Sequence, residues 1–192
     1  MSSPIDWFCQ IIRIAGVNFP GAASLVQLQT EIDSVEVKSR LQKLEDPISF
    51  IHEKVPEISK VIYGELKSND SVNLQFPDDF YLKYSQALAG LEKKRFIKLK
   101  GVAGSRIPHG LKIVDPSYIM YMCFLAEDTK KIQKIMDMVE QCKYGESLNG
   151  DNLKIKFDLP VNVIRAVFEI YAEKGLGVVS KTIGKCIYSC VA

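Results

Sequence analysis

The sequence predicts an α+β protein, predominantly helical, in which an N-terminal helical segment precedes two similar units that each end in a small antiparallel β-hairpin. Three observations lead to this prediction. Apolar residues recur at helical spacing along most of the chain. Short segments with strand-type residues flank turn-forming residues at two places. The same order of elements occurs twice, which places the boundaries at residues 1–45, 46–115 and 116–192.

The N-terminal segment contains two predicted helices. Residues 5–14 are apolar and aromatic and end at a cluster of glycine and proline, which predicts a short docking helix. Residues 22–45 form the second helix. Its apolar side chains follow the spacing of a heptad seam at Leu25, Leu28, Ile32 and Val35. Two roles fit this seam: self-association of two copies, or helix packing inside one chain.

The first unit begins at a helix start. Asp46 is suited to cap a helix and Pro47 to its first turn, and Pro56 begins or kinks a further helical piece. The elements that follow are a strand over 72–76, helical residues 77–95, and strands over 96–100 and 111–114. Residues 77–95 fit either one helix or two short helices broken near Ser85.

The second unit begins in the same way, with Asp115 as a cap and Pro116 in the first turn. The helical pattern from 116 to about 143 is expected to break near Glu127 and Asp128. The remaining elements are a polar loop over 145–152, a strand over 153–157, a helix over 159–174, and strands over 176–180 and 186–191. The helix over 159–174 is apolar on almost every side, which predicts that it is buried, either inside this chain or against another subunit.

The two units can be aligned element by element. Leu74 and Phe76 match Ile155 and Phe157 in the predicted strands. Residues 91–97, Leu-Glu-Lys-Lys-Arg-Phe-Ile, take a helix through basic residues directly into a strand, and residues 172–176 do so more loosely. This order of elements resembles the winged-helix fold over residues 47–114 and 128–191. Winged helices serve both as DNA readers and as protein docking modules, so the resemblance implies one of these two roles.

Charge is concentrated in one part of the chain. The net charge is only +2, from 25 basic and 23 acidic residues, which argues against general affinity for nucleic acid or membranes. Residues 83–112, however, carry eight basic side chains against Glu92, a local net charge of +7. The candidate residues for contact with nucleic acid or another anion are Lys93, Lys94, Arg95, Lys98, Lys100, Arg106 and Lys112. The alternative is a solvated hairpin whose lysines protect a sheet edge.

Little in the sequence supports catalysis or metal binding. The five cysteines, at 9, 123, 142, 186 and 190, form no CxxC pair, and only His52 and His109 are available as imidazole ligands. No nucleophile-elbow, zinc-protease or phosphate-loop sequence occurs. We therefore expect no metal, no cofactor, no small-molecule substrate and no catalytic residues. Buried free thiols in a reducing cytoplasm are the expected state of the cysteines.

The sequence also argues against a membrane protein. The N-terminus has no basic region ahead of its apolar stretch, as a signal peptide would have. The longest uninterrupted apolar run, Tyr118–Ala126, is far shorter than the about 20 residues that a spanning helix needs. We expect a cytoplasmic protein.

Two function hypotheses follow from these observations. The first is a non-catalytic regulatory or adaptor protein that acts through protein–protein interaction and self-association. The alternative is a winged-helix DNA-binding transcriptional regulator that contacts phosphates through the basic hairpin over residues 93–112. The apolar second unit favours the first hypothesis, and the basic stretch favours the second.

Overall fold

The computed structural model describes residues 48, 51–101, 104–180 and 186–191. Over these residues the protein is α+β and mostly helical, with seven helices and two three-stranded antiparallel sheets, as the sequence predicts. The predicted docking helix over 5–14 and the seam of Leu25, Leu28, Ile32 and Val35 lie outside the described residues. No helix in the described part of the chain is both long and apolar enough to cross a membrane.

The first unit has the order helix, strand, helix, helix, strand, strand. Its elements are α4 (Val55–Asn69), β1 (Asn73–Leu74), α5 (Asp78–Lys83), α6 (Ser85–Lys93), β2 (Ile97–Lys100) and β3 (Gly110–Ile113). The sheet order is β1-β3-β2. Of the two alternatives for residues 77–95, the two-helix form is the one observed. The backbone leaves helical geometry at Tyr84, whose side chain is buried, so the chain turns there between α5 and α6.

The second unit repeats this order after one additional helix. Its elements are α7 (Pro116–Leu125), α8 (Thr129–Glu140), β4 (Ser147–Asn149), α9 (Gly150–Phe157), α10 (Val161–Glu173), β5 (Gly177–Val179) and β6 (Ile187–Cys190). The sheet order β4-β6-β5 matches that of the first unit. The predicted break near Glu127 and Asp128 is confirmed. Glu127 adopts a left-handed φ of 61° between α7 and α8, which ends one helix before the next begins.

The predicted strand over 153–157 is wrong, because these residues form α9. The Asn149 side chain accepts hydrogen bonds from the backbone amides of Asp151, at 2.8 Å, and Asn152, at 3.3 Å, which starts a helix. Leu153 is buried, whereas Ile155 is 84% exposed. The first strand of the second unit, β4, lies inside the polar loop predicted over residues 145–152. In the paired repeats, the counterpart of Leu74 is therefore Leu148 and not Ile155.

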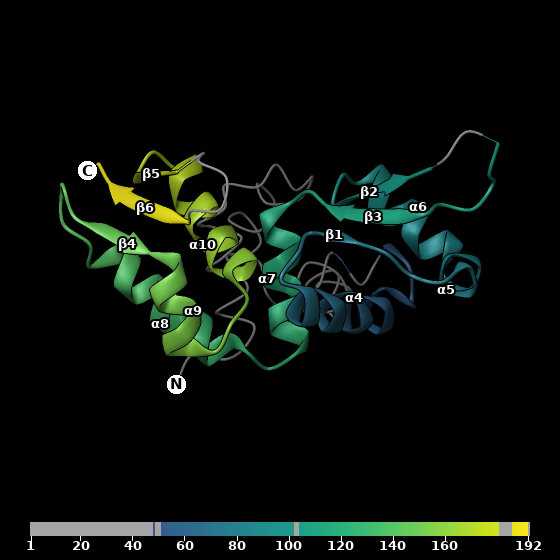
Figure 1. Ribbon diagram of the computed structural model, residues 1–192, viewed down its shortest axis with the longest axis horizontal. Coiled ribbons are helices and arrows are strands. Elements are labelled where there is room, and N and C mark those ends of the chain that lie inside the picture. Colours follow the sequence, from purple (N-terminus) through teal and green to yellow (C-terminus); the bar gives the residue numbers. More distant parts are fainter. Residues whose placement is uncertain (1–47, 49–50, 102–103, 181–185, 192) are drawn as a thin grey trace, which may run out of the picture.

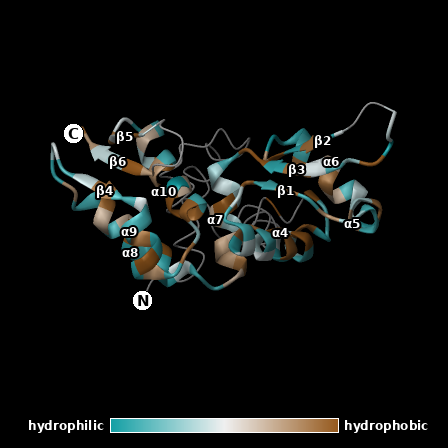
Figure 2. Ribbon diagram, in the orientation of Figure 1, coloured by the Kyte–Doolittle hydropathy of each residue, from teal (hydrophilic) through white to brown (hydrophobic). Residues whose placement is uncertain are grey.

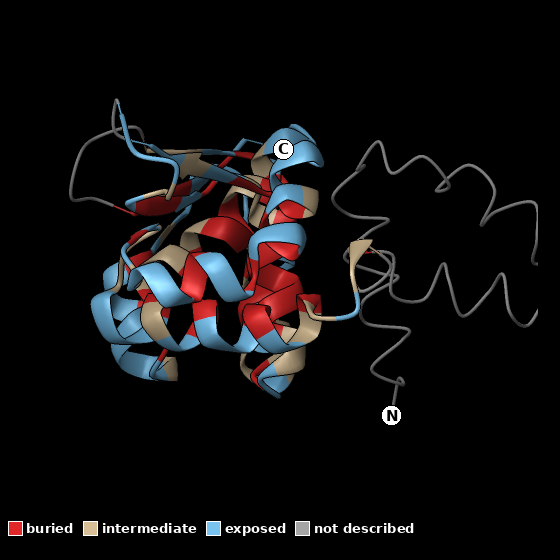
Figure 3. Ribbon diagram, turned by 90° about the vertical axis from the view of Figure 1, so that its right-hand side faces the viewer, coloured by how far each residue is buried: buried red, intermediate tan, exposed pale blue. Residues whose placement is uncertain are grey.

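A central helix, α7, holds the two units together. Every residue from Ser117 to Cys123 is buried, so α7 has no solvent-facing side over this stretch. It packs on α4 of the first unit and on α10 of the second, and the buried residues of both units form one continuous core. Figure 1 shows α7 in the middle of the molecule with the two sheets toward opposite ends, and Figure 3 shows buried residues on the inward faces of the helices. The apolar helix predicted over 159–174 is thus buried inside the chain.

Polar contacts reinforce this joint. The hydroxyls of Ser59 on α4 and Tyr118 on α7 lie 2.8 Å apart. At the end of α4, the Asp70 carboxylate accepts hydrogen bonds from Lys154 Nζ, at 2.6 Å, and from the backbone amide of Asn162, at 3.3 Å. Burial raises the pKa of the Asp70 carboxyl, but these hydrogen bonds outweigh burial, so the pKa lies below its ordinary value. Asp70 therefore caps the first turn of α10 from the other unit.

Two glycines provide a matched test of the packing. A Cβ added at Gly177 would lie 2.2 Å from the ring of Tyr188, which is itself buried against Phe168. We expect Gly177→Ala to lower the free energy of unfolding by about 1 to 3 kcal/mol because the ring has no room to move. Gly64→Ala is the control. Apart from the neighbouring backbone of its own helix, no atom of the described residues lies within 4 Å of its added Cβ, and alanine favours the helix, so a gain of about 0.4 to 1 kcal/mol is expected. Urea unfolding measures the free energy of unfolding of both variants. A Gly177→Ala variant as stable as the parent would contradict the tight packing of the Tyr188 ring.

Candidate nucleic-acid interface

All seven basic residues predicted as contacts are exposed, and all belong to the first unit. Lys93, Lys94 and Arg95 lie at and just beyond the end of α6, and Arg106 lies in the loop between β2 and β3. Lys98, Lys100 and Lys112 lie on the strands themselves. The structure brings these three lysines together on the solvent face of one sheet.

The centre of this face is a row of three side chains across the sheet. Strand pairing places Lys98 of β2 opposite Lys112 of β3, and Lys112 opposite Asn73 of β1. Among the described residues, neither Lys98 nor Lys112 has a carboxylate within 4.0 Å. Like charges directly opposite each other destabilise a sheet. We call Lys98, Lys112 and Asn73 the lysine row.

The one acidic residue of the basic stretch serves the backbone. Glu92 Oε1 accepts a hydrogen bond of 2.8 Å from the backbone amide of Leu99. Because β2 lies at the edge of its sheet, Glu92 thus satisfies a donor that would otherwise face solvent. Its carboxylate holds the edge strand, and it makes no salt bridge to the lysine row in the described residues.

Arg95 occupies a backbone position that favours glycine. Its φ is 64°, in the left-handed region, where a residue with a Cβ is strained. The second unit has Gly175 at its equivalent position, two residues before β5, with φ of 76°. Both residues donate their amide to the last helical turn, Arg95 to Glu92 and Gly175 to Ala172. The first unit therefore keeps a positive charge at a turn where the second unit has no side chain.

The second sheet is an internal comparison for the lysine row. Its equivalent row consists of Val178, Ser189 and Ser147, which pair across β5, β6 and β4 in the same order. No residue of this row is charged. In Figure 2, β1, β2 and β3 carry hydrophilic residues among hydrophobic ones, whereas β6 runs from white to brown.

This comparison bears on the edge-protection hypothesis. Both β2 and β5 are edge strands, yet the equivalent of Lys98 in β5 is Val178. Lys112, moreover, lies on β3, the central strand, where it protects no edge. Edge protection therefore fits Lys98, which lies on the edge strand β2, but not Lys112.

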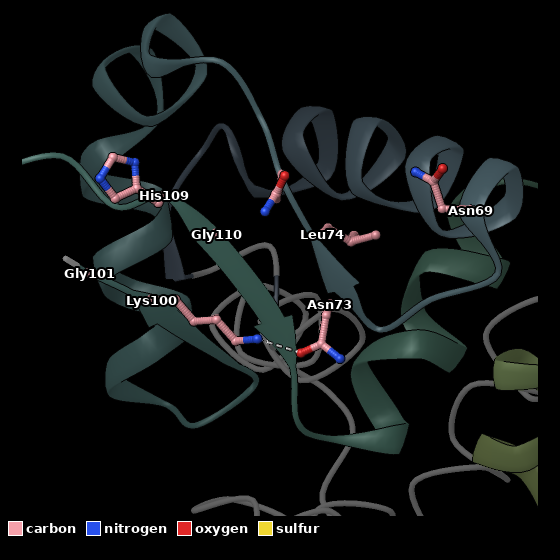
Figure 4. A pocket seen from close by; sticks show the side chains of 8 residues that line it. Asn69, Asn73, Leu74, Lys100, Gly101, His109 and Gly110 are labelled. Carbon is pink, nitrogen blue, oxygen red and sulfur yellow. Dashed lines mark hydrogen bonds between the residues drawn. The ribbon is translucent and has the colours of Figure 1, made fainter. Parts of the chain in front are cut away.

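A polar pocket lies beside the lysine row. It has a volume of about 380 Å³ and is lined by eight residues, namely Asn69, Asn73, Leu74, Gln75, Lys100, Gly101, His109 and Gly110. Lys100 Nζ donates a hydrogen bond of 2.7 Å to Asn73 Oδ1, which joins the pocket to the row (Figure 4). None of the described residues that line the pocket is acidic, and Lys100 gives the lining a positive charge.

Sequence reasoning identified Lys100 but missed the amide residues. Asn73 and Gln75 alternate with apolar residues, and this pattern was interpreted only as the polar side of a strand. Their meeting with Asn69 and Lys100 depends on how β1 pairs with β3, which no local pattern specifies. The signal that could identify these residues is the presence of amide side chains on strands that neighbour basic strands.

The two histidines lie in different surroundings. His52 Nε2 lies 3.3 Å from Gln86 Oε1, and His109 lines the polar pocket. The described residues contain no group of three or more histidine, cysteine, aspartate or glutamate side chains that could hold a metal ion. Burial raises the pKa of the Cys123 thiol to about 12 and that of Cys186 to about 11, so both thiols are protonated at neutral pH and are weak nucleophiles.

Comparison of the chain with models of protein families, with curated proteins and with solved structures found no match in any of the three. Inference about function therefore starts from the geometry of the described residues.

The lysine row predicts a gain in stability when its repulsion is removed. Lys98→Glu places a carboxylate opposite Lys112, so the free energy of unfolding should rise by roughly 0.2 to 1 kcal/mol. The gain should shrink at high salt because surface charges are screened. Urea unfolding at low and high salt measures both effects. A variant less stable than the parent at low salt would show that the two lysines do not repel each other.

Proposed function

We propose that this chain is a non-catalytic cytoplasmic regulator, built from two winged-helix-like units, whose first unit binds the phosphate backbone of nucleic acid through the lysine row. The observation that carries the proposal is the uncompensated pair of Lys98 and Lys112 on a sheet whose counterpart is neutral. The repeated order of elements and the shared sheet order support the winged-helix resemblance. The sequence alone ranks protein interaction above nucleic-acid binding. Because strand pairing places Lys98 opposite Lys112, we rank nucleic-acid binding first.

The surface that makes the contact is the sheet rather than a helix. In a winged helix the second helix before the hairpin reads the major groove, and α6 holds that place here. Its exposed residues offer little for base recognition, and Gln86 lies within hydrogen-bond distance of His52. Asp78 and Asp79, at the start of α5, repel phosphates. We therefore expect binding to duplex DNA that is dominated by phosphate contacts and shows little dependence on base sequence.

Neutralising the lysine row should weaken this binding. In Lys98→Gln/Lys112→Gln, two phosphate contacts are lost, so the slope of log affinity against log salt should become shallower by about 1.8. Affinity at low salt should fall at least about tenfold. Fluorescence anisotropy with a labelled random-sequence duplex, over a series of salt concentrations, measures both.

Lys130→Gln/Lys134→Gln is the matched control. It removes the same charge from two exposed lysines of α8, which lies toward the other end of the molecule (Figure 1). Its affinity and salt slope should stay close to those of the parent. If both double variants weaken binding equally, the effect comes from net charge and the lysine row is not the contact surface.

A second function, protein interaction with self-association, is supported by a different surface. The solvent side of the second sheet exposes Leu176, Val178 and Val191, at 42%, 56% and 46%. Leu176 comes just before β5 and Val191 just after β6, next to the pair formed by Gly177 and Cys190, so the two residues lie at the same end of two neighbouring strands. Exposed apolar residues grouped in this way are typical of a protein interface.

Charge on this surface should disrupt self-association. Val178→Lys/Val191→Lys alters only exposed positions, so the fold should persist while the mass measured by sedimentation equilibrium falls toward the 21.6 kDa of one chain. A polar residue at Ile32 or Val35 tests the predicted N-terminal seam in the same assay. A parent protein that is already a monomer at high concentration would exclude self-association through either surface.

A further inference from the structure

The polar pocket beside the lysine row has the chemistry of a site for one base. Three carboxamides, from Asn69, Asn73 and Gln75, surround it together with Lys100 and His109. Its volume of about 380 Å³ lies in the range of small-ligand sites, roughly 300 to 1,000 Å³. Carboxamides recognise base edges because each offers a donor and an acceptor side by side. An imidazole ring is one of the surfaces on which an unpaired base stacks.

Hydrogen bonds inside the pocket orient two of the carboxamides in opposite senses. Asn73 Oδ1 accepts from Lys100 Nζ at 2.7 Å, which leaves its Nδ2 as the group available to donate to a ligand. Asn69 Nδ2 donates to Glu65 Oε2 at 2.8 Å, which leaves its Oδ1 as the group available to accept. The pocket therefore presents a donor from one side and an acceptor from the other. Nucleobase edges carry the complementary groups.

The floor of the pocket depends on Gly110. A Cβ at this position would lie 3.3 Å from the carbonyl oxygen of Leu74 and 3.7 Å from Lys100 Cβ, so a side chain would crowd the space between the strands. A glycine inside a strand often marks a place where a ligand approaches the backbone. At the equivalent position of the second unit, opposite Asn149, the chain has Ile187.

In the second unit, the side-chain amide at the position equivalent to Gln75 has a different role. Asn149 holds the place of Gln75, and its side chain caps α9. The helix that follows Gln75, α5, begins at Asp78 with Pro77 as its N-cap residue and no side-chain cap, so Gln75 is not needed for that purpose. The base-binding features therefore occur together in the first unit, on the same sheet as the lysine row.

We propose that this pocket receives one unpaired base of a single-stranded nucleic acid whose phosphates lie along the lysine row. The inference rests on the proposed function, because the row supplies the backbone contacts. It adds a preference for single strands over duplexes. A base within a duplex is already paired and stacked, so only a single strand can place a base against Asn69 and Asn73. Lys100 belongs to both the phosphate-binding surface and the pocket. It lies on the same face of the sheet as the lysine row, and its Nζ holds Asn73 in place.

Three labelled probes of equal length test this proposal with the full chain: a single-stranded DNA, a strand with the same phosphates but no bases, and a duplex. The parent should bind the base-bearing strand about 5- to 100-fold more tightly than the abasic strand, the range expected for one stacked base. Asn69→Ser/Gln75→Ala changes two exposed pocket residues outside the lysine row, so it should lose this preference and keep the parent's affinity for the abasic strand.

The matched control is Gln141→Ala/Asn152→Ser, which removes one exposed glutamine amide and one exposed asparagine amide outside the pocket. It should keep the full preference for bases. Equal binding of the base-bearing and abasic strands by the parent would overturn the pocket proposal and leave the phosphate contacts intact. A base preference that survives in Asn69→Ser/Gln75→Ala would also overturn it. Failure to bind any of the three probes at low salt would instead overturn the proposed function itself.

Discussion

The arrangement of the whole molecule depends on the burial of α7. Between Ser117 and Cys123 this helix has no exposed side, so it must be covered by other elements all round. α4 covers it from the first unit and α10 from the second. Small three-stranded sheets gain stability by packing against helices, and α7 gives both sheets a share in one core. The two units are consequently joined with their sheets toward opposite ends of the molecule (Figure 1).

This joint leaves the solvent faces of the two sheets available for different tasks. Both sheets have the same strand order, so each residue of one has a counterpart in the other. The row of Lys98, Lys112 and Asn73 corresponds to Val178, Ser189 and Ser147. Because the fold is formed with either set, the charges of the first sheet are not a requirement of the fold. Under the proposed function, contact with phosphates accounts for these charges.

Local signals in the sequence predicted most helices but not the site as a whole. Asp115 was expected to cap a helix, and its carboxylate does accept a 2.7 Å hydrogen bond from the Ser117 amide. The alternation of Leu153, Ile155 and Phe157 with lysines predicts a strand, but the Asn149 cap starts a helix there and leaves Ile155 exposed. Charge counting found the lysines. The pairing of Lys98 with Lys112, and the meeting of Asn73 with Lys100, depend on contacts between strands that are distant in sequence, which no local pattern contains.

The central claim is that the first sheet, and not the second, meets nucleic acid. Backbone amide chemical shifts, recorded while a single-stranded oligonucleotide is added at low salt, test it most directly. The account predicts that the largest changes occur at Asn73 and along β2 and β3, and that the amides of β5 and β6 stay in place. Changes concentrated in β5 and β6, with β2 and β3 unaffected, would contradict it.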